Sequence, residues 1–170
     1  MDEIPGDLIR LRRPRADDVD ALVSIRRTPE VHARWGGDDI SREVADSIDA
    51  PDFEHYVIEE PGGRVVGAIQ WSEEADPDYR HAQIDIFVDP SVHRRGYATD
   101  AIRALVGYLF DVRGHHRLTI DPAADNAPAI AVYEGVGFRP VGTMRQYERG
   151  PDGVWHDGLL MELVADDWEP

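Results

Sequence analysis

The chain has 170 residues, of which 18 are basic and 34 are acidic, so its formal net charge at pH 7 is −16. This length and a hydrophobic content of 42% predict one globular domain spanning residues 1–170. The acid excess argues against nucleic acid and anionic membranes as partners and favours a cationic one. The absence of cysteine excludes disulfides, thiol nucleophiles and cysteine-ligated metal.

All the basic residues are arginine, which excludes lysine Schiff-base and P-loop chemistry. The sequence has no apolar run of about 18 residues. Its first residues lack the basic and then apolar pattern of a secretory signal. We therefore expect a cytoplasmic protein.

The first half of the chain predicts short strands and helices. Leu8, Ile9 and Leu11 are typical of a strand, and Asp17 or Asp18 is placed to cap the helix that follows over 19–25. The later elements of this half are a helix that stops at Pro51, a hairpin over 53–59 and 64–71, and an acidic loop over 72–79.

The second half of the chain contains the clearest helices. Residues 81–88 alternate, with His81, Gln83, Asp85 and Phe87 on one face, which predicts a strand. An apolar stripe over 98–110 then predicts a long amphipathic helix. The remaining elements are a strand over 117–121, a helix over 127–136 and a hairpin of 138–147 and 154–164. Each of these two helices follows a strand, so we predict a mixed α/β protein.

The junction between the strand 81–88 and the long helix carries the first candidate motif, VDPSVHRRGYA at residues 88–98. Backbone N–H groups at a helix start are unpaired and lie at the positive end of the helix dipole, so they bind phosphate. Arg94 and Arg95 add positive charge, and Gly96 and Ala98 let a ligand's oxygens approach the main chain. Alone, this pattern also fits an ordinary helix cap with solvated arginines.

A second motif, NAPAIAVYEGVGF at residues 126–138, follows the next strand. Its spacing puts Asn126, Ala129 or Ile130, and Tyr133 along one helical face, where a tyrosine either donates a proton or packs. Together the two motifs resemble the acetyl-CoA-binding core of the GCN5-related N-acetyltransferases (GNAT), and the second matches that pattern at every fixed position. In the first motif, His93 takes the usual Arg or Gln position and Arg94 replaces a common glycine.

This resemblance implies the GNAT fold, which is a mixed and mostly antiparallel sheet with a splayed parallel pair, flanked by about four helices. It implies acetyl-CoA as the cofactor, with pantetheine pairing along the strand 84–88 as if it were another strand. The histidines show no metal-ligand spacing, so we expect no metal. The residues that the resemblance assigns to the cofactor are Ile86, Phe87, Val88, His93, Arg94, Arg95, Gly96, Tyr97, Ala98, Thr99, Asn126, Ala129 and Tyr133.

Within the superfamily, segments at 35–37, 71–77, 84–85 and 121–126 look like those of aminoglycoside 6'-N-acetyltransferases. The tail at 147–160 looks more like protein N-terminal and ribosomal-protein acetyltransferases. The resemblance therefore favours the 6'-amine of an aminoglycoside, or another polyamine, as the substrate, with a protein N-terminus as the alternative. A sensor domain that binds acetyl-CoA without catalysis is the non-enzymatic alternative, and the sequence leaves monomer or homodimer open.

An aminoglycoside site would need carboxylates for the amines and aromatic rings for the sugar faces. Asp85 and Asp121 are the better carboxylate candidates, because each lies on the polar side or at the end of a predicted central strand. The residues expected to bind substrate are Trp35, Trp71, Glu73, Glu74, Asp85, Asp121 and Asp157.

The resemblance also implies that the amine attacks the thioester directly, without an acyl-enzyme. A protonated amine must first lose a proton, and the departing thiolate must gain one. The expected catalytic residues are Asp85, Asp121 and Tyr133. Asp85 would receive the first proton through water or orient the ammonium, and Tyr133 would be the acid.

Overall fold

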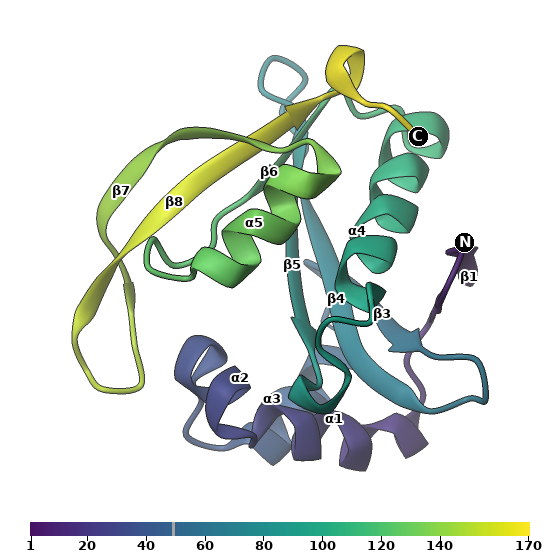
Figure 1. Ribbon diagram of the computed structural model, residues 1–170, viewed down its shortest axis with the longest axis vertical. Coiled ribbons are helices and arrows are strands. Elements are labelled where there is room, and N and C mark those ends of the chain that lie inside the picture. The colour runs from purple at the N-terminus through teal and green to yellow at the C-terminus, as the bar shows by residue number, and fades with distance from the viewer. Residues whose placement is uncertain (49) are drawn as a thin grey trace.

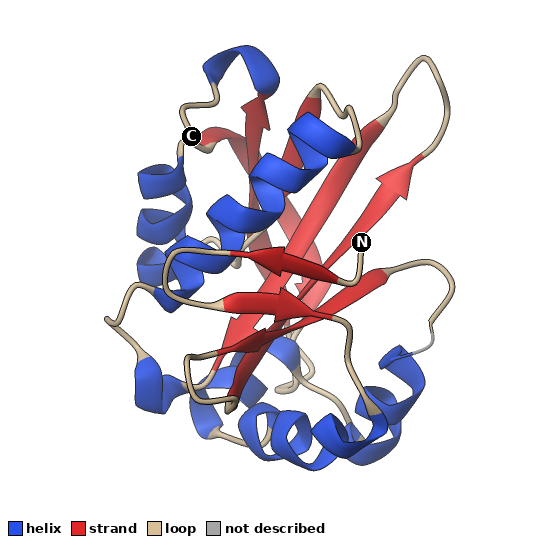
Figure 2. Cartoon of the chain, turned by 90° about the vertical axis from the view of Figure 1, so that its right-hand side faces the viewer, coloured by secondary structure: helices blue, strands red, loops and turns tan. Residues whose placement is uncertain are grey.

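A computed structural model describes residues 1–48 and 50–170 of the chain. Eight strands form one twisted sheet, red in Figure 2, in the order β1-β2-β3-β4-β5-β6-β8-β7. All neighbours are antiparallel except β5 and β6, which are parallel. The strands are β1 (Glu3–Pro5), β2 (Arg10–Arg12), β3 (Glu54–Glu59), β4 (Val65–Glu74), β5 (His81–Val88), β6 (Arg117–Ile120), β7 (Arg139–Arg149) and β8 (Trp155–Val164).

The helices divide between the two faces of the sheet (Figure 1). Leu22 and Val44, from the first and third helices, pack against Val57 on one face. Leu105 and Val136, from the last two helices, join the larger core on the other face. The helices are α1 (Val19–Arg26), α2 (Pro29–Trp35), α3 (Ile40–Ile48), α4 (Tyr97–Gly107) and α5 (Ala127–Val136).

The parallel pair is short, and this shapes the middle of the sheet. β5 pairs with β6 only at Ala82 with Leu118 and at Gln83 with Thr119. On its other side β5 stays paired with β4 as far as Val88. The two parallel strands therefore diverge beyond Gln83, and the β6-facing edge of β5 is left open from Ile84 onward.

The structure confirms the expected fold class, including the splayed parallel pair. Strand 81–88 and helix 127–136 have the predicted bounds. The Asn126 side chain caps α5 by accepting the N–H of Ala129 at 3.4 Å, and Gly137, with φ of 120°, ends the helix.

Four details of the early elements differ from the prediction. The first strand is a pair, β1 and β2, and Leu8 lies between them. Helix α2 was not predicted, because it has only seven residues and begins at Pro29, an N-terminal helix position. β4 runs to Glu74, so the acidic loop starts later. Asp18 precedes α1, but its carboxylate binds the Arg12 guanidinium at 2.8 Å instead of capping the helix.

One of the later elements also differs from the prediction. The helix expected over 98–110 is α-helical only to Gly107 and continues as a π-helical segment, Tyr108–Val112. In the part of the chain that the structure describes, no helix has the length and apolar character needed to span a membrane.

Candidate active site

A cleft of about 540 Å³ opens where β5 and β6 diverge. Its walls come from α2, β5, the end of β6, α5 and β7, which lie far apart in the sequence. The predicted site residues that line it are Trp35, Asp85, Ile86, Asp121, Asn126 and Tyr133. The splay thus brings the predicted catalytic residues and one predicted aromatic wall into one space.

Asp85 lies on β5, directly across from Gln70 of β4. The Gln70 side-chain amide donates to the Asp85 carboxylate at 3.3 Å. Burial raises the pKa of Asp85 from 3.8 to about 6, and the charges of Asp121 and Glu148 act in the same direction. A carboxylate with this pKa is a far better proton acceptor near neutral pH than an ordinary aspartate.

Asp121 follows the last residue of β6. Its Oδ2 accepts from the Gln83 side-chain amide at 3.0 Å and from the Tyr147 hydroxyl at 2.6 Å. Burial raises its pKa, and these two hydrogen bonds oppose the rise. Asp121 is therefore fixed in place by its neighbours and electrostatically linked to Asp85.

Tyr133 enters the cleft from α5, on the other side of the splay. Its side chain is 7% exposed, and its hydroxyl has no hydrogen-bond partner among the residues that the structure describes. Burial first, and then the charges of Asp85 and Asp121, raise its pKa. The phenol therefore keeps its proton and is free to donate it.

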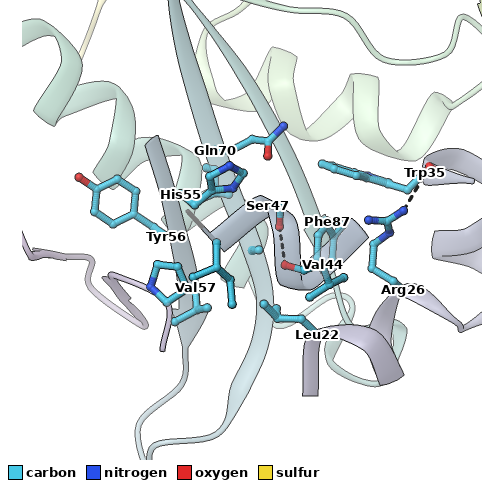
Figure 3. Close-up of a pocket in the computed structure, with 14 residues that line it drawn as sticks. Leu22, Arg26, Trp35, Val44, Ser47, His55, Tyr56, Val57, Gln70 and Phe87 are labelled. Carbon is cyan, nitrogen blue, oxygen red and sulfur yellow. Dashed lines mark hydrogen bonds between the residues drawn. The ribbon is translucent and has the colours of Figure 1, made fainter. Parts of the chain in front are cut away.

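Trp35 lines both the cleft and a separate, smaller cavity, which Figure 3 shows. Its ring meets Phe87 edge to face at 4.9 Å between centroids, and the Arg26 guanidinium lies 5.5 Å from it. Arg26 also donates to the carbonyl of Gly36 at 3.0 Å. Behind Trp35 lies a separate cavity of about 50 Å³, and Gln70, which binds Asp85, lines that cavity.

The basic turn lies between β5 and α4. Arg94 adopts a left-handed conformation, with φ of 64°, at the position where the motif usually has glycine. Gly96, with φ of 82°, precedes α4, so the helix starts with Tyr97 and Ala98. Arg94 and Arg95 are exposed. The turn therefore accommodates an arginine in the glycine position and still presents the helix N-terminus.

Asp100, in the first helical turn of α4, connects the basic turn to the segment between β1 and β2. Its carboxylate accepts the backbone N–H groups of Asp7, Leu8 and Ile9 at 2.8 to 3.0 Å. The Leu8 side chain is thereby held against Gly96, where an added Cβ would lie 3.2 Å from it. The carboxylate in the first turn of α4 is therefore already engaged by three backbone donors.

The other residues expected to bind the cofactor lie on β5, in the basic turn and on α4 and α5. Ile86 lines the cleft, whereas the Phe87 side chain packs on Trp35 instead. The Tyr97 hydroxyl donates to Glu60 at 3.1 Å, and Ala129 packs against the core. Val88, His93 and Thr99 lie at the end of β5, in the turn and in the first turn of α4.

Four predicted substrate residues are not among those that line the cleft, and three of them, Trp71, Glu73 and Glu74, come from β4. Trp71 is 2% exposed and packs on His115, with 5.5 Å between ring centroids. Glu73 binds Arg80 at 2.6 Å and His115 at 3.1 Å, and Glu74 accepts the N–H of Asp76. β4 continues through these three residues, and the alternation of the strand turns Trp71 to the face opposite Asp85.

Asp157, also predicted to bind substrate, supports the chain instead. Its carboxylate accepts the N–H of Gln146 at 2.8 Å, and its carbonyl accepts the N–H of Ala124. The sequence did not indicate a role in the site for the two residues that follow Gln146. Tyr147 and Glu148 line the cleft because β7 is irregular between Met144 and Glu148. Their sequence shows only an ordinary strand of a hairpin.

Within residues 1–48 and 50–170, no three histidine or acidic side chains are grouped so as to hold a metal ion.

The model of the acetyltransferase (GNAT) domain family matches residues 9–139. The chain belongs to the GNAT acetyltransferase family. Its sheet, splay and two motifs are thus those of a GNAT acetyltransferase, an enzyme family that transfers acetyl groups.

Relatives of this GNAT acetyltransferase fall into different substrate groups. The aminoglycoside N(6')-acetyltransferase type 1 of Klebsiella pneumoniae is 27% identical over 166 residues, covering 87% of this chain and 80% of the relative. The N-alpha-acetyltransferase RimI of Mycobacterium tuberculosis is 29% identical over 145 residues, covering 85% and 83%.

A solved structure agrees on the fold. Spermidine N-acetyltransferase from Vibrio cholerae, in complex with CoA and spermine, superposes with a TM-score of 0.80, covering 95% of this chain and 98% of that one at 18% identity. At 18% identity this likeness shows the shared fold alone, and the substrate of this chain depends on the residues of its own cleft.

Proposed function

We propose that the chain transfers the acetyl group of acetyl-CoA to a primary amine of a small cationic substrate, with the 6'-amine of an aminoglycoside as the leading candidate. The observation that carries this proposal is the cleft at the splay. There Asp85 and Tyr133 face one space from opposite sides, with Asp121 beside them. The aminoglycoside relative supports the choice of substrate.

The cofactor residues fit an acetyl-CoA molecule in two ways. The start of α4, with Arg94 and Arg95, offers backbone N–H groups and positive charge to a pyrophosphate. The open edge of β5 from Ile84 to Val88 offers main-chain groups to the amides of pantetheine. When bound there, acetyl-CoA supplies the thioester that the amine attacks.

Asp85 prepares the amine for attack. An alkyl ammonium ion is protonated near pH 7, and it must lose a proton before its nitrogen is a nucleophile. Asp85, with its raised pKa, accepts that proton at its carboxylate, through a water, and its charge holds the ammonium in place beforehand. Asp121 adds to the negative field and is kept in position by Gln83 and Tyr147.

Tyr133 completes the proton transfers. The departing sulfur gains negative charge, and the Tyr133 hydroxyl gives its proton to it. Its burial and lack of another partner among the described residues leave the hydroxyl available for this. The alternative of a sensor without catalysis would not require an acceptor and a donor in one cleft.

A protein N-terminus is the second candidate substrate. RimI of Mycobacterium tuberculosis covers this chain as fully as the aminoglycoside relative does, at 29% identity. The tail at 147–160 also resembles that class. Against it, the cleft concentrates carboxylates, which favours a substrate with several positive charges over a single α-ammonium.

One assay separates these candidates. The purified protein is incubated with acetyl-CoA, and thiol release is followed with kanamycin, tobramycin, spermidine and a peptide that begins with alanine. We expect release with kanamycin and tobramycin, and mass spectrometry should place the acetyl group on the 6'-amine. Release with the peptide alone would contradict the proposal in favour of N-terminal acetylation.

A further inference from the structure

The strand β7 carries an irregularity that no regular hairpin would have. Met144 pairs with Gly158 and Glu148 with His156, so β7 uses two more residues than β8 between these pairs. Gln146 lies in the extra segment with φ of 50°, a left-handed conformation that is uncommon outside glycine. The Asp157 carboxylate holds it by accepting the Gln146 N–H at 2.8 Å.

This bulge aims two side chains into the cleft. The Tyr147 hydroxyl reaches the Asp121 carboxylate at 2.6 Å, and Glu148 lines the cleft beside it. Gly158 makes room for the Tyr147 ring, because a Cβ there would lie 2.9 Å from the ring's Cδ1. The β7–β8 hairpin, which carries Tyr147 and Glu148 on β7, extends away from the rest of the sheet at the left of Figure 1.

The cleft then holds more negative charge than one amine can balance. Asp85, Asp121 and Glu148 all line it, and none forms an ion pair with another residue of the described chain. Two cations act electrostatically on Glu148, and Arg34 also lines the cleft, but both form ion pairs with other residues. Arg34 binds Asp125 at 2.6 Å, and His156 binds Asp152 at 2.9 Å.

We propose that Asp121 and Glu148 form a subsite for a second ammonium group of the substrate, separate from Asp85, which faces the amine that is acetylated. The Tyr133 side chain is 7% exposed, and its hydroxyl faces the same cleft without a partner in the described chain, which supports a cleft built for a ligand. The inference rests on the proposed function and narrows it. The substrate is a small molecule with at least two ammonium groups, and the β7 bulge selects it.

Binding of simple amines tests the subsite without requiring turnover. Calorimetry in the presence of CoA compares diamines of three, four and five carbons with propylamine, butylamine and pentylamine. We expect the best diamine to bind about tenfold or more tightly than its monoamine, since a charged hydrogen bond in a partly buried site has about that effect. Glu148→Gln should bring this ratio down to about threefold or less.

A matched control and a second variant keep the test sharp. Glu30→Gln changes an exposed glutamate of α2 that does not line the cleft and should leave the ratio unchanged. Gly158→Ala disturbs the bulge through Tyr147 and should lower the ratio even if Glu148→Gln folds poorly. Thermal unfolding of each variant shows whether it is folded.

The outcomes separate this inference from the proposed function. Equal affinity for diamines and monoamines, or an unchanged ratio in folded Glu148→Gln, would overturn the subsite even if kanamycin is acetylated. A preserved preference for diamines that depends on Glu148 supports the subsite, even if thiol release shows that kanamycin is not a substrate.

Discussion

Replacing Asp85 by asparagine should stabilise the free protein while impairing the reaction. In the folded chain, burial, Asp121 and Glu148 raise the pKa of Asp85 from 3.8 to about 6. A carboxyl group with a raised pKa contributes stability that is complete below its unfolded pKa and is lost as the pH rises through the folded value. Above about pH 7, the ionised Asp85 therefore destabilises the fold.

The size of this effect follows from the two pKa values. A rise from 3.8 to about 6, at about 1.4 kcal/mol for each pKa unit, gives about 3 kcal/mol. Asparagine removes the charge, and its carbonyl oxygen can still accept from Gln70. In a chain of this length, about 3 kcal/mol corresponds to a rise in Tm of about 6 to 12 °C.

Thermal unfolding of the wild type and Asp85→Asn at pH 4 and pH 8 measures the effect. We expect a large difference in Tm at pH 8 and almost none at pH 4, where the wild-type carboxyl group is protonated. Asp166→Asn, which changes an exposed aspartate, should shift Tm little at either pH. Equal Tm values for Asp85→Asn and the wild type at pH 8 would refute the reasoning from burial.

The same variant also tests the chemical role of Asp85. Its kcat/KM at pH 8 should fall by about 100-fold or more, which is typical when a general base is removed. The wild-type kcat/KM should rise with pH around the pKa of Asp85, about 6, and this rise should be absent from Asp85→Asn. A variant that is more stable and fully active would leave the raised pKa without a role in catalysis.

Three other substitutions give distinct results. Tyr133→Phe should lower kcat by about 100-fold or more and leave the Kd for acetyl-CoA, measured by calorimetry, unchanged. Tyr79→Phe, at an exposed tyrosine, is its control. Equal turnover in Tyr133→Phe and the wild type would eliminate Tyr133 as the acid. Gly158→Ala should raise KM for the amine several-fold, because a Cβ would lie 2.9 Å from the Tyr147 ring. Arg94→Gly should stabilise the protein by about 1 kcal/mol in denaturant unfolding, because φ is 64°, and weaken acetyl-CoA binding by loss of charge; lower stability would contradict this.

Elements whose signals are local could be predicted from the sequence. The helix over 127–136 has a capping asparagine before it and a glycine after it, and both behave as predicted. The strand over 81–88 shows its alternation plainly. Such signals depend on neighbours a few residues away, so they need no knowledge of the tertiary structure.

The composition of the cleft could be predicted only in part. Asp85 and Asp121 were identifiable as polar residues on or beside central strands, where a carboxylate is costly. Trp71 was expected at the substrate, but the face of a strand residue depends on strand register, and it is the adjacent residue, Gln70, that points toward Asp85. Glu148 was missed because only the bulge in β7 turns it inward.

The short pairing of β5 with β6 connects the cofactor and substrate halves of the site. Since hydrogen bonding between these strands ends at Gln83, the edge of β5 beyond it is free for the cofactor. The same divergence lets Tyr133, from the face of α5, and Asp85, opposite Gln70, line one space. A longer parallel ladder would close both the edge and the cleft. Under the proposed function, the carboxylates of the cleft, Asp85, Asp121 and Glu148, meet the cationic amine where the sheet opens, and β5 leads from there into the basic turn that suits an anionic cofactor.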